Sequence, residues 1–392
     1  MRRRLIPAAV AAATVALAAC GSSGTNGGGG AGTPSQPMRI GFIVDQTGPL
    51  AAIGAGYLRG SQVAVDAWNS DSKHRRVDLH PCDSQSTGEG AISCYQQLRD
   101  SVDAISGPSL FVGLASVRTT AMKGSLPLIS AAPLAFPDGK SMMFQNLPTI
   151  EDGVGAAFQY FKSTGLKKIA TLTSNDQPGN LAKQAAQKLH GQYGIDLVTT
   201  QVFDPQAQNL APQAEQISAS HPDAVFAWTA GPQLITSLRA LFTAGVSVPV
   251  MLNYASMVTP LLQGTTGSSP KTLLFFATKA FDPSHITDQT YAARVKDFYT
   301  RFQATFHQPP DLAALDAADD LLILAQAGQN ASSRQEIKSK LESGTSFYGI
   351  MFADYKFSAD DHIGKHGAGA FDILQWQPTT STWTLVDTNA HS

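Results

Sequence analysis

Residues 38–70, MRIGFIVDQTGPLAAIGAGYLRGSQVAVDAWNS, begin with a strand pattern and end with a helical one. MRIGFIVD is short and apolar, as buried parallel strands are, and LRGSQVAVDAWNS has apolar residues at helical spacing. A dinucleotide-binding loop places its glycines directly after the strand. Here eight residues separate Asp45 from Gly54, and Gly54, Gly56 and Gly60 are spaced GxGxxxG. We therefore expect Gly54 and Gly56 in a loop that runs close to a ligand, and Gly60 in a helix packed on the sheet.

The alternation of strand and helix patterns continues along most of the chain. Short apolar segments such as VDAISGP, LPLISAA, KKIATLTSN and PDAVFAWTA alternate with helical patterns. Such alternation forms βαβ units with parallel sheets. It pauses at residues 133–149 and then restarts, so we predict an α/β protein with two similar lobes and mainly parallel sheets. Near the end, GAFDILQWQPTTSTWTLVD predicts a β-hairpin.

The first residues predict export and membrane attachment. Three arginines precede an apolar stretch at 5–19 that is too short to span a membrane and fits a secretory signal peptide. LAAC at 17–20 resembles a bacterial lipobox, in which Cys20 becomes the lipidated N-terminus; a plain signal peptide with an incidental cysteine is the alternative. The segment that follows is rich in Gly, Ser and Thr and predicts a flexible linker. We expect a signal peptide at 1–19, a linker at 20–37 and a lipid anchor that holds the protein on the extracytoplasmic side of the cell membrane.

The composition restricts the partners of the folded body. About 355 residues remain after the linker, which favours two lobes over one core. A formal net charge of −2 gives no reason to expect nucleic acid binding. Because an exported protein meets oxidising conditions, we expect a disulfide between Cys82 and Cys94. Two buried free thiols are the alternative, and a metal site is disfavoured because neither cysteine has a histidine at ligand spacing.

An ordered set of motifs spans residues 38–387. TGPLAAIG and GYLRGSQVAVDAWN are followed by HPCDSQSTGEGAISCYQQL, AISGPSLFVG, LPLISAAPLAF, IATLTSNDQPGN, AVFAWTAGPQLITSLRALFTAG and FSADDHIGKHGAGAFDILQW. This order resembles the type I periplasmic binding proteins, specifically the leucine/isoleucine/valine-binding branch that feeds ABC importers. The resemblance implies two Rossmann-like lobes, joined by a three-strand hinge, that close on a small ligand. It further implies a monomer that meets an ABC transporter permease, with no catalytic residue, metal or cofactor.

The resemblance also divides the chain. It assigns residues 38–147 and 278–350 to lobe 1, and residues 148–277 and 351–392 to lobe 2. Ligands of open α/β sheets bind at the carboxyl ends of the strands. The ligand-binding residues that these strand ends and the resemblance predict are Asp45, Ile53, Ser109, Leu110, Ala132, Pro133, Gln177, Trp228, Asn253 and Tyr254. Core packing is the alternative for Ile53, Trp228 and Tyr254, and capping of the following turn is the alternative for Asp45.

These residues depart from the pattern of the amino-acid-binding members. There, hydroxyl residues of the first loop hold the ligand carboxylate, but here Leu110 follows the single hydroxyl of Ser109, and the second loop has Pro133. Asn253 and Tyr254 stand where the resemblance leads us to expect an acid for the ligand ammonium group. An amino acid needs both charges paired when it is desolvated, because unpaired polar groups are costly. We therefore expect a partly apolar or aromatic small molecule rather than a standard branched-chain amino acid.

Other function classes have weaker support. The sequence has no G-x-S-x-G motif of a hydrolase. His362 and His366 are four residues apart within a loop pattern, which leaves either a metal site or a solvated surface open. A lipoprotein of the same fold that senses a ligand and signals to a membrane partner remains the alternative to transport.

Overall fold

The computed structural model describes residues 36–133 and 140–388. Its first sheet has five parallel strands in the order β2-β1-β3-β4-β5. Both faces of β1 are buried, because Ile43 joins one apolar cluster while Ile40 and Phe42 join others. The strands of this sheet are β1 (Met38–Val44), β2 (Val77–Asp83), β3 (Ala104–Ser106), β4 (Leu128–Ser130) and β5 (Met143–Gln145).

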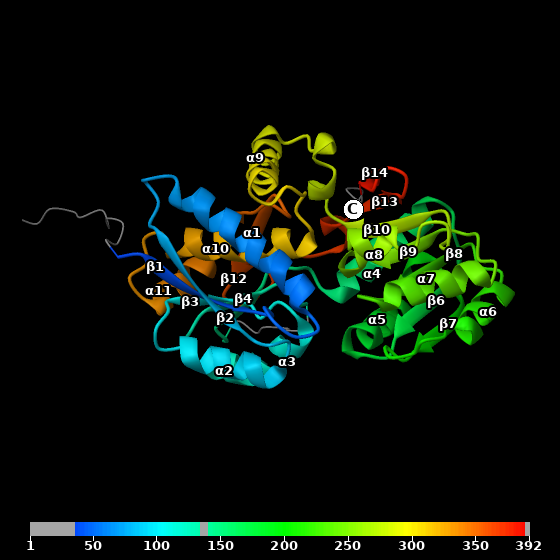
Figure 1. Ribbon diagram of the computed structural model, residues 1–392, viewed down its shortest axis with the longest axis horizontal. Helices are drawn as coiled ribbons and strands as arrows, with labels where there is room; N and C mark the ends of the chain where they lie inside the picture. Colours follow the sequence, from blue (N-terminus) through cyan, green and yellow to red (C-terminus); the bar gives the residue numbers. More distant parts are fainter. Residues whose placement is uncertain (1–35, 134–139, 389–392) are drawn as a thin grey trace, which may run out of the picture. The chain divides into compact units, whose positions relative to one another are not determined.

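Helices cover the two faces of this first sheet, as Figure 1 shows with α2 and α3 on one face and α1 and α10 on the other. Helix α10 comes from far along the chain, yet it packs along the length of α1. Helices α9 and α11 lie beside α1 and α10 respectively. The helices are α1 (Ala51–Asn69), α2 (Gly88–Leu98), α3 (Phe111–Lys123), α9 (Gln289–Phe306), α10 (Leu312–Gly328) and α11 (Arg334–Leu341).

Gly54, Gly56 and Gly60 all lie in α1, so the expectation of a loop at Gly54 and Gly56 was wrong. The helix begins at Ala51, directly after the turn at Gly48, which has a positive φ of 87°. A Cβ atom on Gly60 would lie 2.0 Å from the carbonyl oxygen of Ala314 in α10. The absence of a side chain therefore permits close packing of two helices, rather than packing of α1 on the sheet.

The second sheet has seven strands in the order β14-β13-β10-β9-β8-β6-β7. The five strands β6 to β10 are parallel, and the C-terminal hairpin adds β13 and β14 in antiparallel orientation, as predicted. The strands are β6 (Lys168–Ser174), β7 (Asp196–Phe203), β8 (Ala224–Trp228), β9 (Val250–Asn253), β10 (Leu273–Ala277), β13 (Asp372–Gln377) and β14 (Thr382–Thr388). Helices α4 (Ile150–Ser163), α5 (Gln177–Tyr193), α6 (Ala211–Ala219), α7 (Gln233–Thr243) and α8 (Thr259–Gln263) belong to the same part of the chain.

The chain passes between the two sheets three times: after β5, after β10 and before β13. A small antiparallel pair, β11 (Ser343–Tyr348) and β12 (Asp354–Ser358), precedes the last passage. Its strands contact α10 and α11. Residues 354–358, which form β12, thus pack beside α11, a helix of the first sheet, although the prediction assigned residues after 350 to lobe 2. The residue limits of the two lobes stay a prediction.

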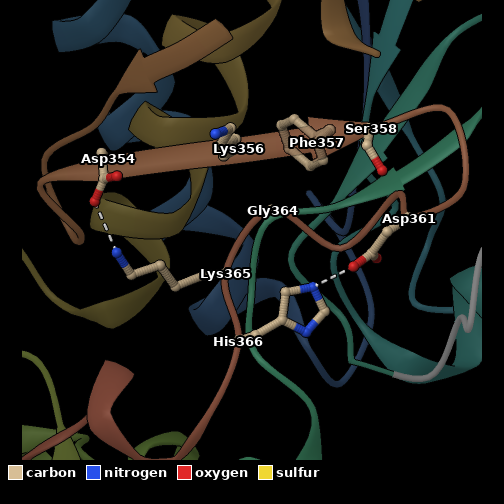
Figure 2. A pocket seen from close by; sticks show the side chains of 8 residues that line it. All are labelled: Asp354, Lys356, Phe357, Ser358, Asp361, Gly364, Lys365 and His366. Carbon is tan, nitrogen blue, oxygen red and sulfur yellow. Dashed lines mark hydrogen bonds and ion pairs between the residues drawn. The ribbon is translucent and has the colours of Figure 1, made fainter. Parts of the chain in front are cut away.

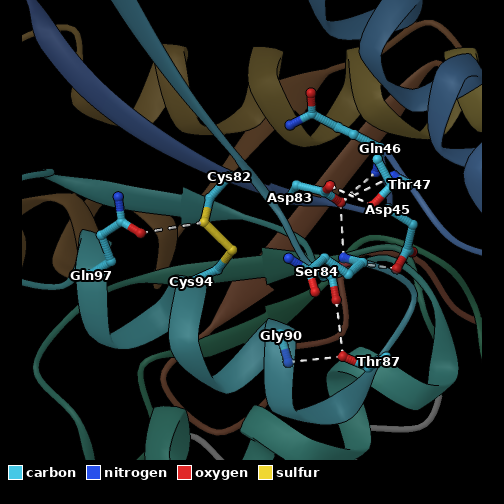
Figure 3. Close-up of a disulfide and its surroundings, with 11 residues drawn as sticks. Asp45, Gln46, Thr47, Cys82, Asp83, Ser84, Thr87, Gly90, Cys94 and Gln97 are labelled. Atoms are coloured by element: carbon cyan, nitrogen blue, oxygen red, sulfur yellow. Dashed lines mark hydrogen bonds between the residues drawn. A yellow bond between two sulfur atoms is a disulfide. The ribbon is translucent and has the colours of Figure 1, made fainter.

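A disulfide joins Cys82, in β2, to Cys94, in α2, as expected, with 5.7 Å between the Cα atoms (Figure 3). The carboxylate of the next residue, Asp83, accepts hydrogen bonds from the backbone N–H groups of Gln46 and Thr47 at 2.9 and 3.1 Å. The disulfide therefore links α2 to β2, and Asp83 at the end of β2 binds the backbone of the turn that precedes α1. The predicted signal peptide and Cys20 lie outside the described residues, and no described helix is long and apolar enough to cross a membrane.

Candidate ligand-binding site

The predicted residues lie where parallel strands end. Asp45 follows β1, Ser109 and Leu110 follow β3, and Ala132 and Pro133 follow β4. In the second sheet, Gln177 begins the helix after β6, Trp228 ends β8, and Asn253 and Tyr254 stand at the end of β9. Ile53 is the exception, because it lies in the first turn of α1. Because β1 to β5 of the first sheet are parallel, and β6 to β10 of the second sheet are parallel, the carboxyl ends of each set share one edge, where open α/β sheets bind ligands.

Two apolar members of the first-sheet group pack against the same cluster. Ile53 and Leu110 both pack against an apolar cluster that contains Phe42 and Tyr57. Asp45 is buried and accepts a hydrogen bond from Ser84 Oγ at 2.6 Å. Burial raises the pKa of this carboxyl. The bond to Ser84 occupies one of the two carboxylate oxygens of Asp45, whereas the N–H groups of Gln46 and Thr47, in the turn that follows, donate to Asp83.

The other first-sheet residues have separate surroundings. Ser109 Oγ is buried, and no group of the described chain forms a hydrogen bond with it. The backbone N–H of Ala132 donates to Ser130 Oγ at 3.2 Å. Pro133 lines a pocket of about 410 Å³ together with residues of α4 and α5, among them the paired Glu151 and Lys188. Gln177 is exposed and does not line that pocket.

The second-sheet group forms a compact aromatic cluster. The rings of Trp228 and Tyr254 meet edge to face with centroids 6.4 Å apart, and Tyr254 stacks on Phe371 at 5.8 Å. Asn253 is fully buried, and its Nδ2 donates to the carbonyl oxygen of Thr229 at 2.8 Å. The structure therefore brings three of the predicted residues together, because β8 and β9 are hydrogen-bonded neighbours.

The sequence prediction missed a group of acids in α10. Asp316, Asp319 and Asp320 are at most 1% exposed. Asp319 accepts hydrogen bonds from the backbone N–H groups of residues 350–352 and from the Tyr355 hydroxyl, which fixes the turn between β11 and β12. Asp320 accepts from Ser106 Oγ at 3.2 Å. The sequence did contain a signal for this group: three acids stand within the apolar segment LAALDAADDLLILAQAG. Acids that are buried with such a segment require partners.

Asp316 lies near tyrosines from two distant parts of the chain. Burial is the main cause that raises the pKa of Tyr57 and of Tyr254, and the charge of Asp316 adds to it in both cases. Asn146, which follows β5, donates from Nδ2 to the backbone oxygen of Asp316 at 3.5 Å. Burial, together with the neighbouring acid Asp320, also raises the pKa of Asp316 well above its usual range. The hydrogen bond links α10 to the end of β5, and the charge of Asp316 acts on side chains of α1 and of the end of β9.

The two histidines of the loop before β13 have different partners. His362 is buried between the carbonyl oxygen of Met143, 2.8 Å from Nδ1, and the carboxylate of Glu342, 2.9 Å from Nε2. His366 instead forms an ion pair with Asp361 at 2.8 Å, beside a pocket of about 400 Å³ (Figure 2). Within residues 36–133 and 140–388, no group of three or more His, Cys, Asp or Glu side chains is arranged to hold a metal ion.

Comparison with known proteins identifies the class. The family model described as periplasmic binding protein matches residues 37–379, so the chain belongs to this family of solute-binding proteins. No curated protein matches the chain. The family resemblance and the α/β fold expected from the sequence are thereby confirmed, and solved structures of type I periplasmic binding proteins share the fold.

Three solved structures illustrate the likeness. LivJ from Streptococcus pneumoniae, in complex with isoleucine, is 21% identical, with a TM-score of 0.74 over 90% of this chain and 100% of that one. An ABC transporter solute-binding protein from Rhodopseudomonas palustris, in complex with benzoate, is 16% identical, with a TM-score of 0.72 over 90% and 96%. An ABC transporter substrate-binding protein from Sphaerobacter thermophilus is 20% identical, with a TM-score of 0.74 over 90% and 97%. At these identities the likeness concerns the fold.

Proposed function

We propose that the protein is a lipid-anchored, extracytoplasmic substrate-binding protein that captures a small molecule between its lobes and delivers it to an ABC importer. The family supports a binding role, and the three relatives named above are described as parts of transporters or carry a small ligand. The observation that carries the proposal is the strand-end edge of the second sheet, where Trp228, Asn253 and Tyr254 meet. Cys20 is the proposed lipidation site.

The ligand of this proposal is not a standard branched-chain amino acid. Leu110 stands where the amino-acid-binding members use a hydroxyl, and it packs, like Ile53, against an apolar cluster. Pro133, at the end of β4, offers neither a hydroxyl nor a backbone N–H. The carboxylate of leucine would therefore lack donors that it has in water, which weakens its binding.

A thermal-shift screen of the detergent-purified full chain tests the binding role. The compounds are amino acids, amides, aromatic acids, amines and small polyols. Binding to the native state alone raises stability by RT ln(1 + [L]/Kd), so a micromolar ligand at millimolar concentration raises the melting temperature by several degrees. Tight binding of leucine or valine would refute the ligand argument, and a complete lack of small-molecule binding would refute the binding role.

Two cellular experiments test the anchor and the importer partner. Replacement of Cys20 by alanine should release the protein from the membrane fraction, because the lipid chains supply the attachment. Deletion of the gene should abolish uptake of the labelled ligand. If uptake persists while a transcriptional response to the ligand disappears, the protein is a sensor of the same fold.

A further inference from the structure

Several buried oxygen atoms close to the strand-end edge lack hydrogen-bond donors. They are Asp316 Oδ1 and Asp320 Oδ1 in α10, Asn146 Oδ1 after β5, and Asn253 Oδ1 at the end of β9. All four side chains are at most 1% exposed, and no group of the described chain donates to these atoms. A buried acceptor without a donor is costly, and a buried carboxyl without a partner favours its neutral form, as the raised pKa of Asp316 indicates; a bound cation would allow it to ionise. The arrangement therefore calls for a bound group that is rich in donors.

The chain itself supplies no positive charge to Asp316. The charges that act on its pKa are those of the carboxyl groups of Asp320, Asp319 and Asp311. Arg59, in α1, pairs with Asp311, the residue directly before α10, at 3.5 Å. At the end of β10, Lys279 faces Asp372 at 3.9 Å. Described basic side chains of this region thus have other acids as partners, and the acceptors around Asp316 remain without a cation.

Two buried tyrosines are close enough to Asp316 for its charge to act on them. Tyr57 comes from α1 and Tyr254 from the end of β9, and both feel the charge of Asp316. Tyr254 also belongs to the aromatic cluster with Trp228 and Phe371. Aromatic faces attract cations, and the attraction grows when both groups are removed from water. An acid, an amide oxygen and aromatic rings together form surroundings that favour an ammonium group and disfavour a carboxylate.

We infer that Asp316, with Asn146 and the rings of Tyr57 and Tyr254, recognises the positively charged N–H group of a small organic cation that carries no carboxylate. The inference rests on the proposed binding function and names its ligand class: a primary amine or amidine with an apolar or aromatic body. Asp316 supplies the countercharge, Asn146 Oδ1 accepts a second N–H, and the apolar cluster of Ile53 and Leu110 provides apolar surface for the body. The lack of a hydroxyl at Leu110 and Pro133 fits a ligand without a carboxylate.

Two matched series of compounds test this inference by calorimetry on the detergent-purified full chain. The first series is phenethylamine, phenylalanine and 3-phenylpropanoate; the second is isopentylamine, leucine and 4-methylpentanoate. Within each series the body is constant and only the charged groups change. We expect at least one amine to bind more tightly than its amino acid and its acid, by about tenfold or more, because loss of a buried charge partner has effects of that size.

A pair of variants tests whether Asp316 binds the charged group of the amine. Asp316→Asn keeps the shape of the side chain but removes its charge, and should weaken amine binding by about tenfold or more. Asp297→Asn, on the exposed face of α9, is the control and should leave binding unchanged. An unchanged affinity of Asp316→Asn would assign Asp316 a merely structural role and overturn the inference.

The wild-type comparison stays decisive even if Asp316→Asn does not fold. Tighter binding of an acid or amino acid than of the matching amine overturns the cation assignment and leaves the proposed binding function intact. Binding of none of the six compounds also overturns the amine assignment, and the broad thermal-shift screen then decides separately whether the protein binds small molecules at all.

Discussion

The close contact of α1 with α10 makes a sharp prediction for Gly60→Ala. A Cβ atom at this position would lie 2.0 Å from the carbonyl oxygen of Ala314 and 2.5 Å from its Cα atom. Ordinary van der Waals contact begins at 3.4 Å, so the two helices must separate by about 1.4 Å. Overpacking of this kind costs about 3 kcal/mol, while alanine gains about 1 kcal/mol of helix propensity over glycine. We expect a net loss of about 2 kcal/mol.

Gly191→Ala is the matched control, because Gly191 lies in helix α5 and an added Cβ atom would meet no atom within 4 Å. Only the gain in helix propensity remains, so this variant should be stabilised by about 1 kcal/mol. Urea unfolding followed by circular dichroism measures both variants. Replacement of glycine by alanine should thus lower the free energy of unfolding at Gly60 and raise it at Gly191. A Gly60→Ala protein as stable as the wild type would refute the close helix packing.

Three further predictions concern local stability. Burial raises the pKa of Asp319 to about 6, so the folded chain keeps this proton to higher pH than the unfolded chain. The resulting contribution to the free energy of unfolding is lost as the pH rises from about 4 to about 6. Urea titrations of the wild type should show a loss of about 3 kcal/mol over this range, and Asp319→Asn should lack this contribution. Replacement of Cys82 and Cys94 by serine should lower the free energy of unfolding by about 3 kcal/mol, because their separation of 12 residues closes a short loop. Thr149→Ala should destabilise α4 by about 1 kcal/mol in a thermal melt, since Thr149 forms a capping box there.

Each of these predictions has an outcome that would contradict it. Other buried acids, Asp316 among them, also have raised pKa values, so part of the pH slope remains in Asp319→Asn; a slope equal to that of the wild type would contradict the assignment to Asp319. Serine variants as stable as the wild type would show that the bridge does not restrict the unfolded chain. Thr149→Ser keeps the hydroxyl cap, so an equal loss in Thr149→Ser and Thr149→Ala would exclude the cap as the cause.

The sequence predicted the alternating fold because strand and helix periodicities are local properties. It predicted the hairpin of β13 and β14 for the same reason. It missed β5 (Met143–Gln145), which follows an interruption of the pattern, and it placed the start of α1 too late, because glycines are poor helix formers in isolation. The tertiary contact with α10 decides the conformation at Gly54 and Gly56, and no local pattern reveals that contact.

Some residues of the candidate site could likewise be predicted from local patterns, and others depend on tertiary contacts. Trp228, Asn253 and Tyr254 could be predicted together, because neighbouring parallel strands bring their ends to one edge. Asp316 could not, since its partners Tyr57 and Asn146 come from distant segments. The acids of α10 were visible in the sequence, but an acid in an apolar helix indicates only that partners exist. Which residues these partners are depends on how α10 packs.

The order of the strands has a consequence for the way in which the chain acquires its structure. The first sheet is complete once β5 has been made, but α10, which packs along α1, follows only after the parallel strands of the second sheet. The second sheet in turn gains β13 and β14 from the last residues of the chain. Contacts between segments this far apart in sequence form slowly, because long loops must close first.

Neither half can therefore reach its final packing while the chain is still being synthesised. An N-terminal fragment that ends before residue 312 leaves the α10 face of α1 uncovered, and one that ends before residue 372 leaves β10 as a sheet edge. For a chain that we propose to be exported, this order delays the final packing of both sheets until segments far along the chain have been added. The same topology excludes a simple division of the protein into two independently expressed lobes.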